Sequence, residues 1–169
     1  YGGTIRGLSW SPDGKYLAAG GDTAQTVKVY KFTGNSLTLN STSASYGGSI
    51  YALSWSPDGN YIAAGGATTQ TLNIYRFSGN NLTLVAQSGN YGGIINRMSW
   101  SPDGKHVAIS GSITNALYIY YFSGNSLSLV KTANFAGSIG FVTCWSPDGK
   151  YVILSDSSTT KINVYYFSG

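Results

Sequence analysis

Apolar and polar residues alternate along this chain in short runs that favour β-strands. In the first copy of the pattern four strands are expected, at residues 5–11, 15–20, 26–32 and 36–40. The third of these is nearly continuously apolar or aromatic, which is typical of a strand covered on both faces of its sheet. A helical period of hydrophobic residues is not found in the sequence. The chain is therefore predicted to be all-β.

Two recurring turn signals separate the predicted strands. The tetrad Ser-Pro-Asp-Gly occurs at residues 11–14, 56–59, 101–104 and 146–149, after Trp10, Trp55, Trp100 and Trp145. Proline presets φ, aspartate suits the next position and glycine accepts a positive φ, so each tetrad predicts a hairpin between the first and second strands. Gly-Asn pairs predict the turn between the third and fourth strands, at residues 34–35, 79–80 and 124–125.

These signals repeat with a fixed period. Neighbouring tryptophans of the tetrads are 45 residues apart, and residues 1–45 match residues 46–90 at about 27 of 45 positions. A unit of this size cannot bury its own apolar faces, so neighbouring units are expected to stack. Four units follow, at about residues 1–45, 46–90, 91–134 and 135–169. The fourth has one extra residue before Trp145, which is a candidate β-bulge.

Tandem four-stranded units with an aromatic residue before Ser-Pro-Asp-Gly resemble the blades of WD-repeat β-propellers. The resemblance covers essentially the whole chain, but Tyr30-Lys31 and its equivalents replace the Trp-Asp pair of that family, and Tyr-Gly-Gly replaces its Gly-His. The resemblance implies a β-propeller built from four-stranded antiparallel blades, four per chain, forming one propeller or half-propeller domain. It also implies a non-catalytic interaction scaffold.

The fourth unit ends after its third strand, so its fourth strand is expected to be missing. Residues 161–167 would then form an open aromatic edge, and such edges pair readily with other strands. A trimmed or disordered tail, a strand donated by another chain and a longer array are all consistent with this end. We expect self-association, with a dimer of eight blades as the favoured assembly, or a strand-donating partner.

Composition argues against catalysis. Charged residues are 9% of the chain, glutamate is absent, and only Asp22 and Asp156 lie outside the four turns. A single histidine, His106, occupies an aromatic position of the repeat, so we expect no catalytic residues, no metal site and no cofactor. Cys144 replaces a serine of the other units and is interpreted as a small buried side chain.

Charge and polarity bear on partners and location. The net charge of +4 comes from basic residues spread thinly along the chain, so nucleic-acid binding is not expected. No apolar run is long enough to cross a membrane. The Ser-, Thr-, Asn- and Tyr-rich polar surface favours a secreted or cell-surface protein.

Candidate binding residues lie at the end of the blades opposite the fixed turns, where the units differ, and along the first strands. They are Tyr1, Tyr46, Tyr91, Arg6, Tyr51, Asn96, Arg97, Asp22, Gln25, Gln70 and Asn115. The three tyrosines, each followed by Gly-Gly, could form an aromatic platform for sugars or peptides, or could pack between blades. Protein, peptide and glycan ligands are all considered. The alternatives to a scaffold are therefore an extracellular structural assembly built through the open edge and a lectin.

Overall fold

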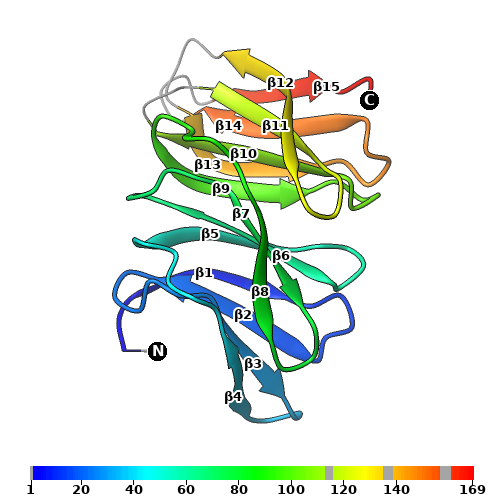
Figure 1. Ribbon diagram of the computed structural model, residues 1–169. Helices are drawn as coiled ribbons and strands as arrows, with labels where there is room; N and C mark the ends of the chain where they lie inside the picture. Colours follow the sequence, from blue (N-terminus) through cyan, green and yellow to red (C-terminus); the bar gives the residue numbers. More distant parts are fainter. Residues whose placement is uncertain (1, 113–115, 135–138, 157–160) are drawn as a thin grey trace.

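The computed structural model describes residues 2–112, 116–134, 139–156 and 161–169, and in these ranges the regular structure consists of β-strands (Figure 1). The strands are β1 (Ile5–Trp10), β2 (Tyr16–Gly21), β3 (Lys28–Phe32), β4 (Leu37–Thr42), β5 (Ile50–Trp55), β6 (Tyr61–Gly66), β7 (Asn73–Phe77), β8 (Leu82–Gln87), β9 (Ile94–Trp100), β10 (His106–Ser112), β11 (Ala116–Phe122), β12 (Leu127–Asn134), β13 (Ile139–Trp145), β14 (Tyr151–Asp156) and β15 (Lys161–Tyr166). The strands predicted in the first unit agree with these bounds to within two residues. The described residues contain no helix of the length and hydrophobicity needed to cross a membrane.

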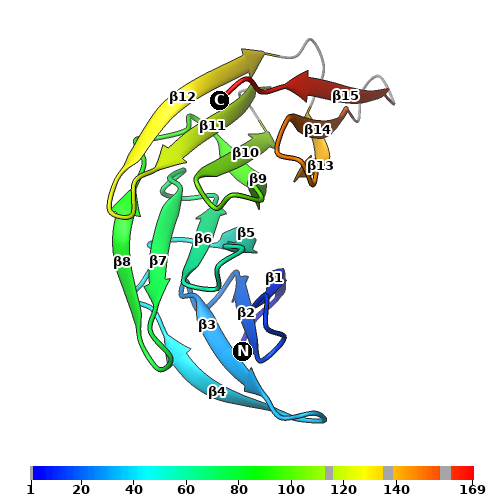
Figure 2. The same cartoon turned by 90° about the vertical axis from the view of Figure 1, so that its right-hand side faces the viewer.

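Consecutive strands pair in antiparallel fashion to form four sheets, or blades. The first three blades have four strands each, and in the described residues the fourth has three, in the order β13-β14-β15. The blades fan out along an arc, with β1, β5, β9 and β13 on the inner side and β4, β8 and β12 on the outer side (Figure 2). The prediction of an all-β propeller with four-stranded antiparallel blades is confirmed.

Each Ser-Pro-Asp-Gly tetrad closes its hairpin through its own side chains. In the first blade Ser11 Oγ donates to Asp13 Oδ1 over 2.6 Å and accepts the Tyr16 amide over 2.9 Å. The same carboxylate oxygen accepts the Lys15 amide over 3.0 Å, and Gly14 has the predicted positive φ of 69°. The serine, aspartate and glycine roles recur in the other three turns. The four turns are therefore built in the same way. They lie at the end of the blades opposite the loops in which the four units differ.

These hydrogen bonds lower the pKa of all four turn aspartates. For Asp13 and Asp148 the serine hydrogen bond is the main cause of the lower pKa. For Asp58 and Asp103 burial acts to raise the pKa, but hydrogen bonds from Ser56 and Ser101 and from backbone amides outweigh it. A carboxyl whose pKa is lower in the folded state stabilises the fold above its unfolded pKa.

We therefore expect the free energy of unfolding to decrease as the pH falls below about 4, the usual pKa of aspartate. Because folding lowers the pKa of every turn aspartate, the losses of stability on protonation add. Urea unfolding followed by circular dichroism between pH 7 and pH 2 measures this effect, and the Asp58→Asn variant is expected to show a smaller acid loss than the wild type. A free energy of unfolding that stays constant from pH 5 to pH 2 would contradict the prediction.

The core lies between the blades. Val27 and Val29 of the first blade pack in one cluster with Tyr46, Ile50 and Trp55 of the second. A tryptophan contacts the preceding blade at each junction: the amide of Trp55 donates to Ser9 Oγ, and the indole Nε1 atoms of Trp100 and Trp145 donate to the carbonyls of Ser54 and Ser99. The tryptophan before each tetrad except the first thus hydrogen-bonds to the preceding blade.

The innermost strand of each blade contains a β-bulge, and the sequence predicted only the one in the fourth blade. The register shifts between Ile139 and Thr143 in the fourth blade, where the extra residue predicted a bulge. Narrower shifts occur in the other three inner strands, at Arg6, Tyr51 and Asn96. The inserted residue therefore widens a bulge that all four blades share.

Candidate binding site on the inner strands

Three of the predicted binding residues occupy the bulge positions of three neighbouring inner strands. A bulge redirects the side chain of the extra residue, and here Arg6 of β1, Tyr51 of β5 and Asn96 of β9 line one cavity with Arg97. The volume of this cavity is about 300 Å³. A second cavity of about 180 Å³ shares these four residues. Residues 91 positions apart in sequence are thus brought together, and we call this group the inner-strand site.

Electrostatic contacts fix the arginines of the inner-strand site. Arg6 Nε donates to Asp22 Oδ1 over 2.5 Å, and the Arg6 guanidinium lies 4.8 Å from the centre of the Tyr51 ring. The hydrogen bond to Asp22 raises the pKa of Arg6 above its usual value. Arg97 Nη1 donates to the carbonyl of Asn96 over 2.6 Å. The described residues of this site thus include two guanidinium groups and one carboxylate.

Two of the three tyrosines considered for an aromatic platform, Tyr46 and Tyr91, pack between blades instead. Tyr46 and Tyr91 are buried, and their hydroxyls donate to the carbonyls of Thr71 and Ala116, each over 2.6 Å. The packing alternative is correct at both positions, because the adjacent Gly-Gly segment lets the ring turn into the junction between blades. Tyr1 lies outside the described residues.

The two glutamines support the loops rather than the cavity. Gln25 and Gln70 have positive φ values of 50° and 52°, which are unusual for residues other than glycine. Their carbonyls accept the amides of Tyr46 and Tyr91 over 2.6 and 2.7 Å. Each glutamine therefore ties the loop after the second strand to the start of the next blade. Asn115 lies outside the described residues.

His106 and Cys144 were the residues considered for catalysis or metal binding, and the structure shows their surroundings. His106 is packed against Trp145 and Phe167, and burial lowers its pKa. Within the described residues, His, Cys, Asp and Glu form no group of three that could hold a metal ion. Cys144 is exposed rather than buried. The reason is its position: Ser9, its equivalent, faces the next blade, and the described residues place no blade beyond the fourth.

The comparisons with known proteins agree with this geometry. The model of the family described as "WD domain, G-beta repeat" matches residues 1–31, which include the first of the Ser-Pro-Asp-Gly turns. The model of the family described as "Eukaryotic translation initiation factor eIF2A" matches residues 22–166, and the chain belongs to this family. No curated protein matches the sequence.

A solved structure of the same fold was also found. It is a chain from a structure described as "Crystal Structure of Mitotic Checkpoint Complex", with a TM-score of 0.84 and 20% sequence identity. The match covers 100% of this chain and 51% of that chain, so our protein spans about half of its length. At this identity the match shows the fold alone.

Proposed function

We propose that this protein is a non-catalytic interaction scaffold whose inner-strand site binds a segment of another protein. The observation that carries the proposal is the shared bulge, which directs Arg6, Tyr51 and Asn96 from three blades into one cavity. Tyrosine and arginine, together with tryptophan, are enriched among the residues that dominate the energy of protein interfaces. The two guanidinium groups favour segments with acidic side chains, because guanidinium groups form strong paired hydrogen bonds with carboxylates.

The proposal predicts which substitutions weaken peptide binding. Peptides selected from a random display library for binding to the protein are expected to bind the Tyr51→Ala and Arg97→Gln variants at least about tenfold more weakly, a loss typical of central interface residues. Arg76→Gln is the matched control, since Arg76 lies on β7, is exposed, and carries the same charge. Fluorescence anisotropy measures the dissociation constants.

Equal affinity for the wild type and both site variants would contradict the proposal. Thermal unfolding of each variant checks that the fold is retained. The family to which the chain belongs is described as a translation initiation factor. Protein components of translation initiation are therefore the first natural partners to test.

We also propose that two copies of this chain associate. The face of each blade that contacts the preceding blade is called here the incoming face. On the incoming face of the first blade, Leu8 and Trp10 are 57% and 50% exposed. Their equivalents in the second blade, Leu53 and Trp55, are 9% and 6% exposed because the first blade covers them. The first blade thus presents an apolar face of the kind that is buried at the internal junctions.

The opposite face of the fourth blade is its counterpart. The face of each blade that contacts the following blade is called the outgoing face. Ile162 and Val164 on the outgoing face of the fourth blade are 73% and 63% exposed, whereas their equivalents Val27 and Val29 in the first blade are fully buried. The two exposed faces resemble the two sides of an internal junction, which supports head-to-tail contact between two copies.

A further inference from the structure

Another cavity lies at the end of the blades that carries the Ser-Pro-Asp-Gly turns, between the first and second blades. Its volume is about 180 Å³, and the two blades that enclose it have four strands each. Asp13 and Asp58 of the two neighbouring turns line it, together with the rings of Tyr16, Trp55 and Phe77. It shares no residue with the inner-strand site. We call it the turn-face cavity.

Three aromatic rings form one side of the turn-face cavity. The rings of Tyr16 on β2 and Trp55 on β5 have centres 6.5 Å apart and planes 25° apart. Phe77, the last residue of β7, meets both rings edge-on, at 4.9 and 5.4 Å. One ring comes from the first blade and two come from the second, so the packing between these blades shapes the cavity. The faces of such rings attract cations.

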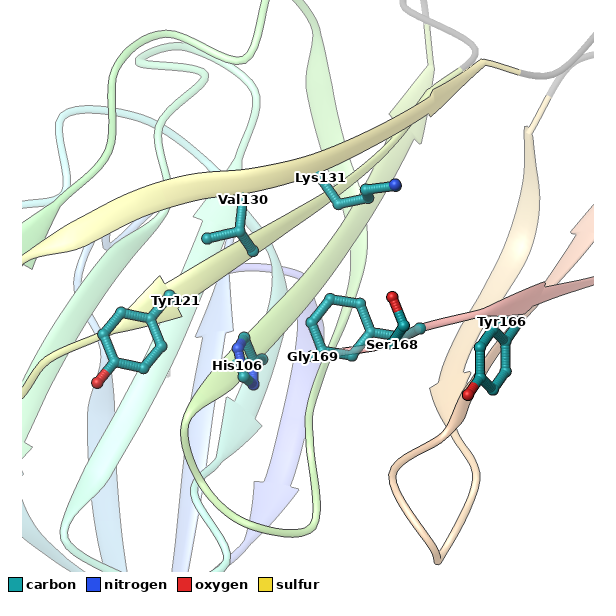
Figure 3. Close-up of a pocket in the computed structure, with 8 residues that line it drawn as sticks. His106, Tyr121, Val130, Lys131, Tyr166, Ser168 and Gly169 are labelled. Carbon is teal, nitrogen blue, oxygen red and sulfur yellow. The ribbon is translucent and has the colours of Figure 1, made fainter.

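The repeat builds the same aromatic arrangement between the third and fourth blades. His106 takes the place of Tyr16 there and lies on β10 near Tyr121 (Figure 3). The His106 ring lies 6.3 Å from the Trp145 ring and 4.9 Å from the Phe167 ring, and the latter two are 5.2 Å apart. These distances closely match those of the first junction. The arrangement is therefore a property of the repeated junction between blades.

The charged residues that line the turn-face cavity are both acidic. The pKa values of Asp13 and Asp58 are lower than usual, so both carboxylates are charged at neutral pH. In each, Oδ1 accepts the turn serine and a main-chain amide. Asp13 Oδ2 lies 3.6 Å from Lys15 Nζ in an exposed pair, and Asp58 Oδ2 accepts the side-chain amide of Asn60. A carboxylate oxygen has two lone pairs, so each Oδ2 atom has room for another donor.

Trp55 adds a hydrogen-bond donor to the turn-face cavity. Its side chain lines the cavity and is 6% exposed, and within the described residues its indole Nε1 has no hydrogen-bond partner. At the next two junctions Trp100 and Trp145 donate the same N–H to carbonyls of the preceding blade. Buried polar groups are nearly always paired. An occupant of the first junction therefore gains most if it carries both a cation and a hydrogen-bond acceptor.

An arginine residue within a peptide meets these requirements. Its planar guanidinium has five N–H donors for two carboxylates, stacks on aromatic rings and is weakly hydrated, whereas a lysine ammonium is strongly hydrated. A quaternary ammonium group has no N–H to donate. The main-chain carbonyl of the same residue is an acceptor.

We propose that the turn-face cavity binds an arginine side chain from a segment of a partner protein. The guanidinium pairs with Asp13 and Asp58 and lies against the rings of Tyr16 and Trp55, and a main-chain carbonyl of the segment accepts the Trp55 indole N–H. This gives the protein a second binding surface, and the proposal does not rest on the inner-strand site.

A nuclear magnetic resonance titration of the isotope-labelled 169-residue protein with N-acetyl-arginine amide tests the proposal. We expect a saturable shift of the Trp55 indole N–H signal. N-acetyl-citrulline amide has nearly the same shape without the charge and is expected to bind at least about tenfold more weakly, because hydrogen bonds between charged groups are stronger. Equal affinity for these two probes, a higher affinity for N-acetyl-lysine amide, or no saturable shift at the solubility limit overturns the proposal.

The double variant Asp13→Asn and Asp58→Asn tests the role of the carboxylates. Asparagine keeps an oxygen for the turn serine but removes the charge, so the arginine probe is expected to bind at least about tenfold more weakly. Asp148→Asn makes the same change in the turn of the fourth blade and is the matched control, expected to leave the titration at Trp55 unchanged. Wild-type affinity in the folded double variant overturns the proposal.

Tyr16→Leu answers the case in which the double variant does not fold. It leaves both turns intact, removes one ring, and is expected to weaken binding of the arginine probe at least about threefold. Unchanged affinity in this variant also overturns the proposal. Tyr51→Ala, which alters the inner-strand site, is expected to bind the probe like the wild type, so failure at one site can be distinguished from failure at the other.

Discussion

Leu72→Ala is expected to lower the free energy of unfolding by about 3–5 kcal/mol, whereas Leu84→Ala is expected to lower it by less than about 1 kcal/mol. Both leucines belong to the second blade, but only one lies in a junction between blades. Leu72 is fully buried in a cluster with Tyr91, Ile95 and Trp100 of the third blade. Leu84 lies on the outer strand β8 and is 45% exposed.

The two losses in the free energy of unfolding differ because only the alanine at position 72 leaves a buried cavity. At Leu72 the lost methyl groups come from a closely packed junction that backbone pairing holds on both sides, so the site cannot collapse fully. At Leu84 water occupies the freed space. Urea unfolding followed by circular dichroism, at one protein concentration for all variants, gives the free energies. Equal losses at the two leucines would show that the junctions between blades do not dominate stability.

The repeat made much of the fold predictable. The turn tetrads are local devices: Ser11, Asp13 and Gly14 hydrogen-bond within six residues and need no distant partner, so their chemistry can be read directly from the sequence. The period then implied stacked blades, because no single unit can cover its own apolar faces. The departures from the WD-repeat pattern did not change the fold, since the junctions depend on the tryptophans and on the third strands.

The direction of individual side chains was harder to predict. Tyr46 and Tyr91 look like loop residues in the sequence, but a tyrosine can present its ring to water or insert it into a junction, and only the neighbouring blade decides this. The bulges at Arg6 and Tyr51 left no mark in the sequence, because every copy has them and the alignment of copies shows no insertion there. Only the wider bulge of the fourth blade changed the spacing.

The inner-strand site was nevertheless predictable as a group. Variation between otherwise similar copies identified Arg6, Tyr51, Asn96 and Arg97, and the structure places them in one cavity. The three strands expected in the fourth unit agree with the described strands β13, β14 and β15.

The 169-residue protein is expected to have twice the 17.9 kDa mass of one chain in solution, and single aspartate substitutions on either exposed face are expected to reduce this mass by half. Leu8→Asp places a charge on the incoming face of the first blade. Ile162→Asp places one on the outgoing face of the fourth blade. In a closed pair of chains both contacts are identical, so either change damages both of them at once, and an unpaired buried charge costs several kcal/mol.

Mixing the two variants distinguishes head-to-tail contact from other arrangements. Leu8→Asp keeps a normal outgoing face and Ile162→Asp keeps a normal incoming face, so an equimolar mixture can form one intact contact and is expected to recover part of the dimer. Light scattering coupled to size-exclusion chromatography measures the masses, with Leu129→Asp on the outer strand β12 as the control that leaves the dimer unchanged. A wild-type protein that is monomeric at every concentration, or an Ile162→Asp variant that stays dimeric through its incoming faces, would rule out this assembly, because the head-to-tail contact requires both faces.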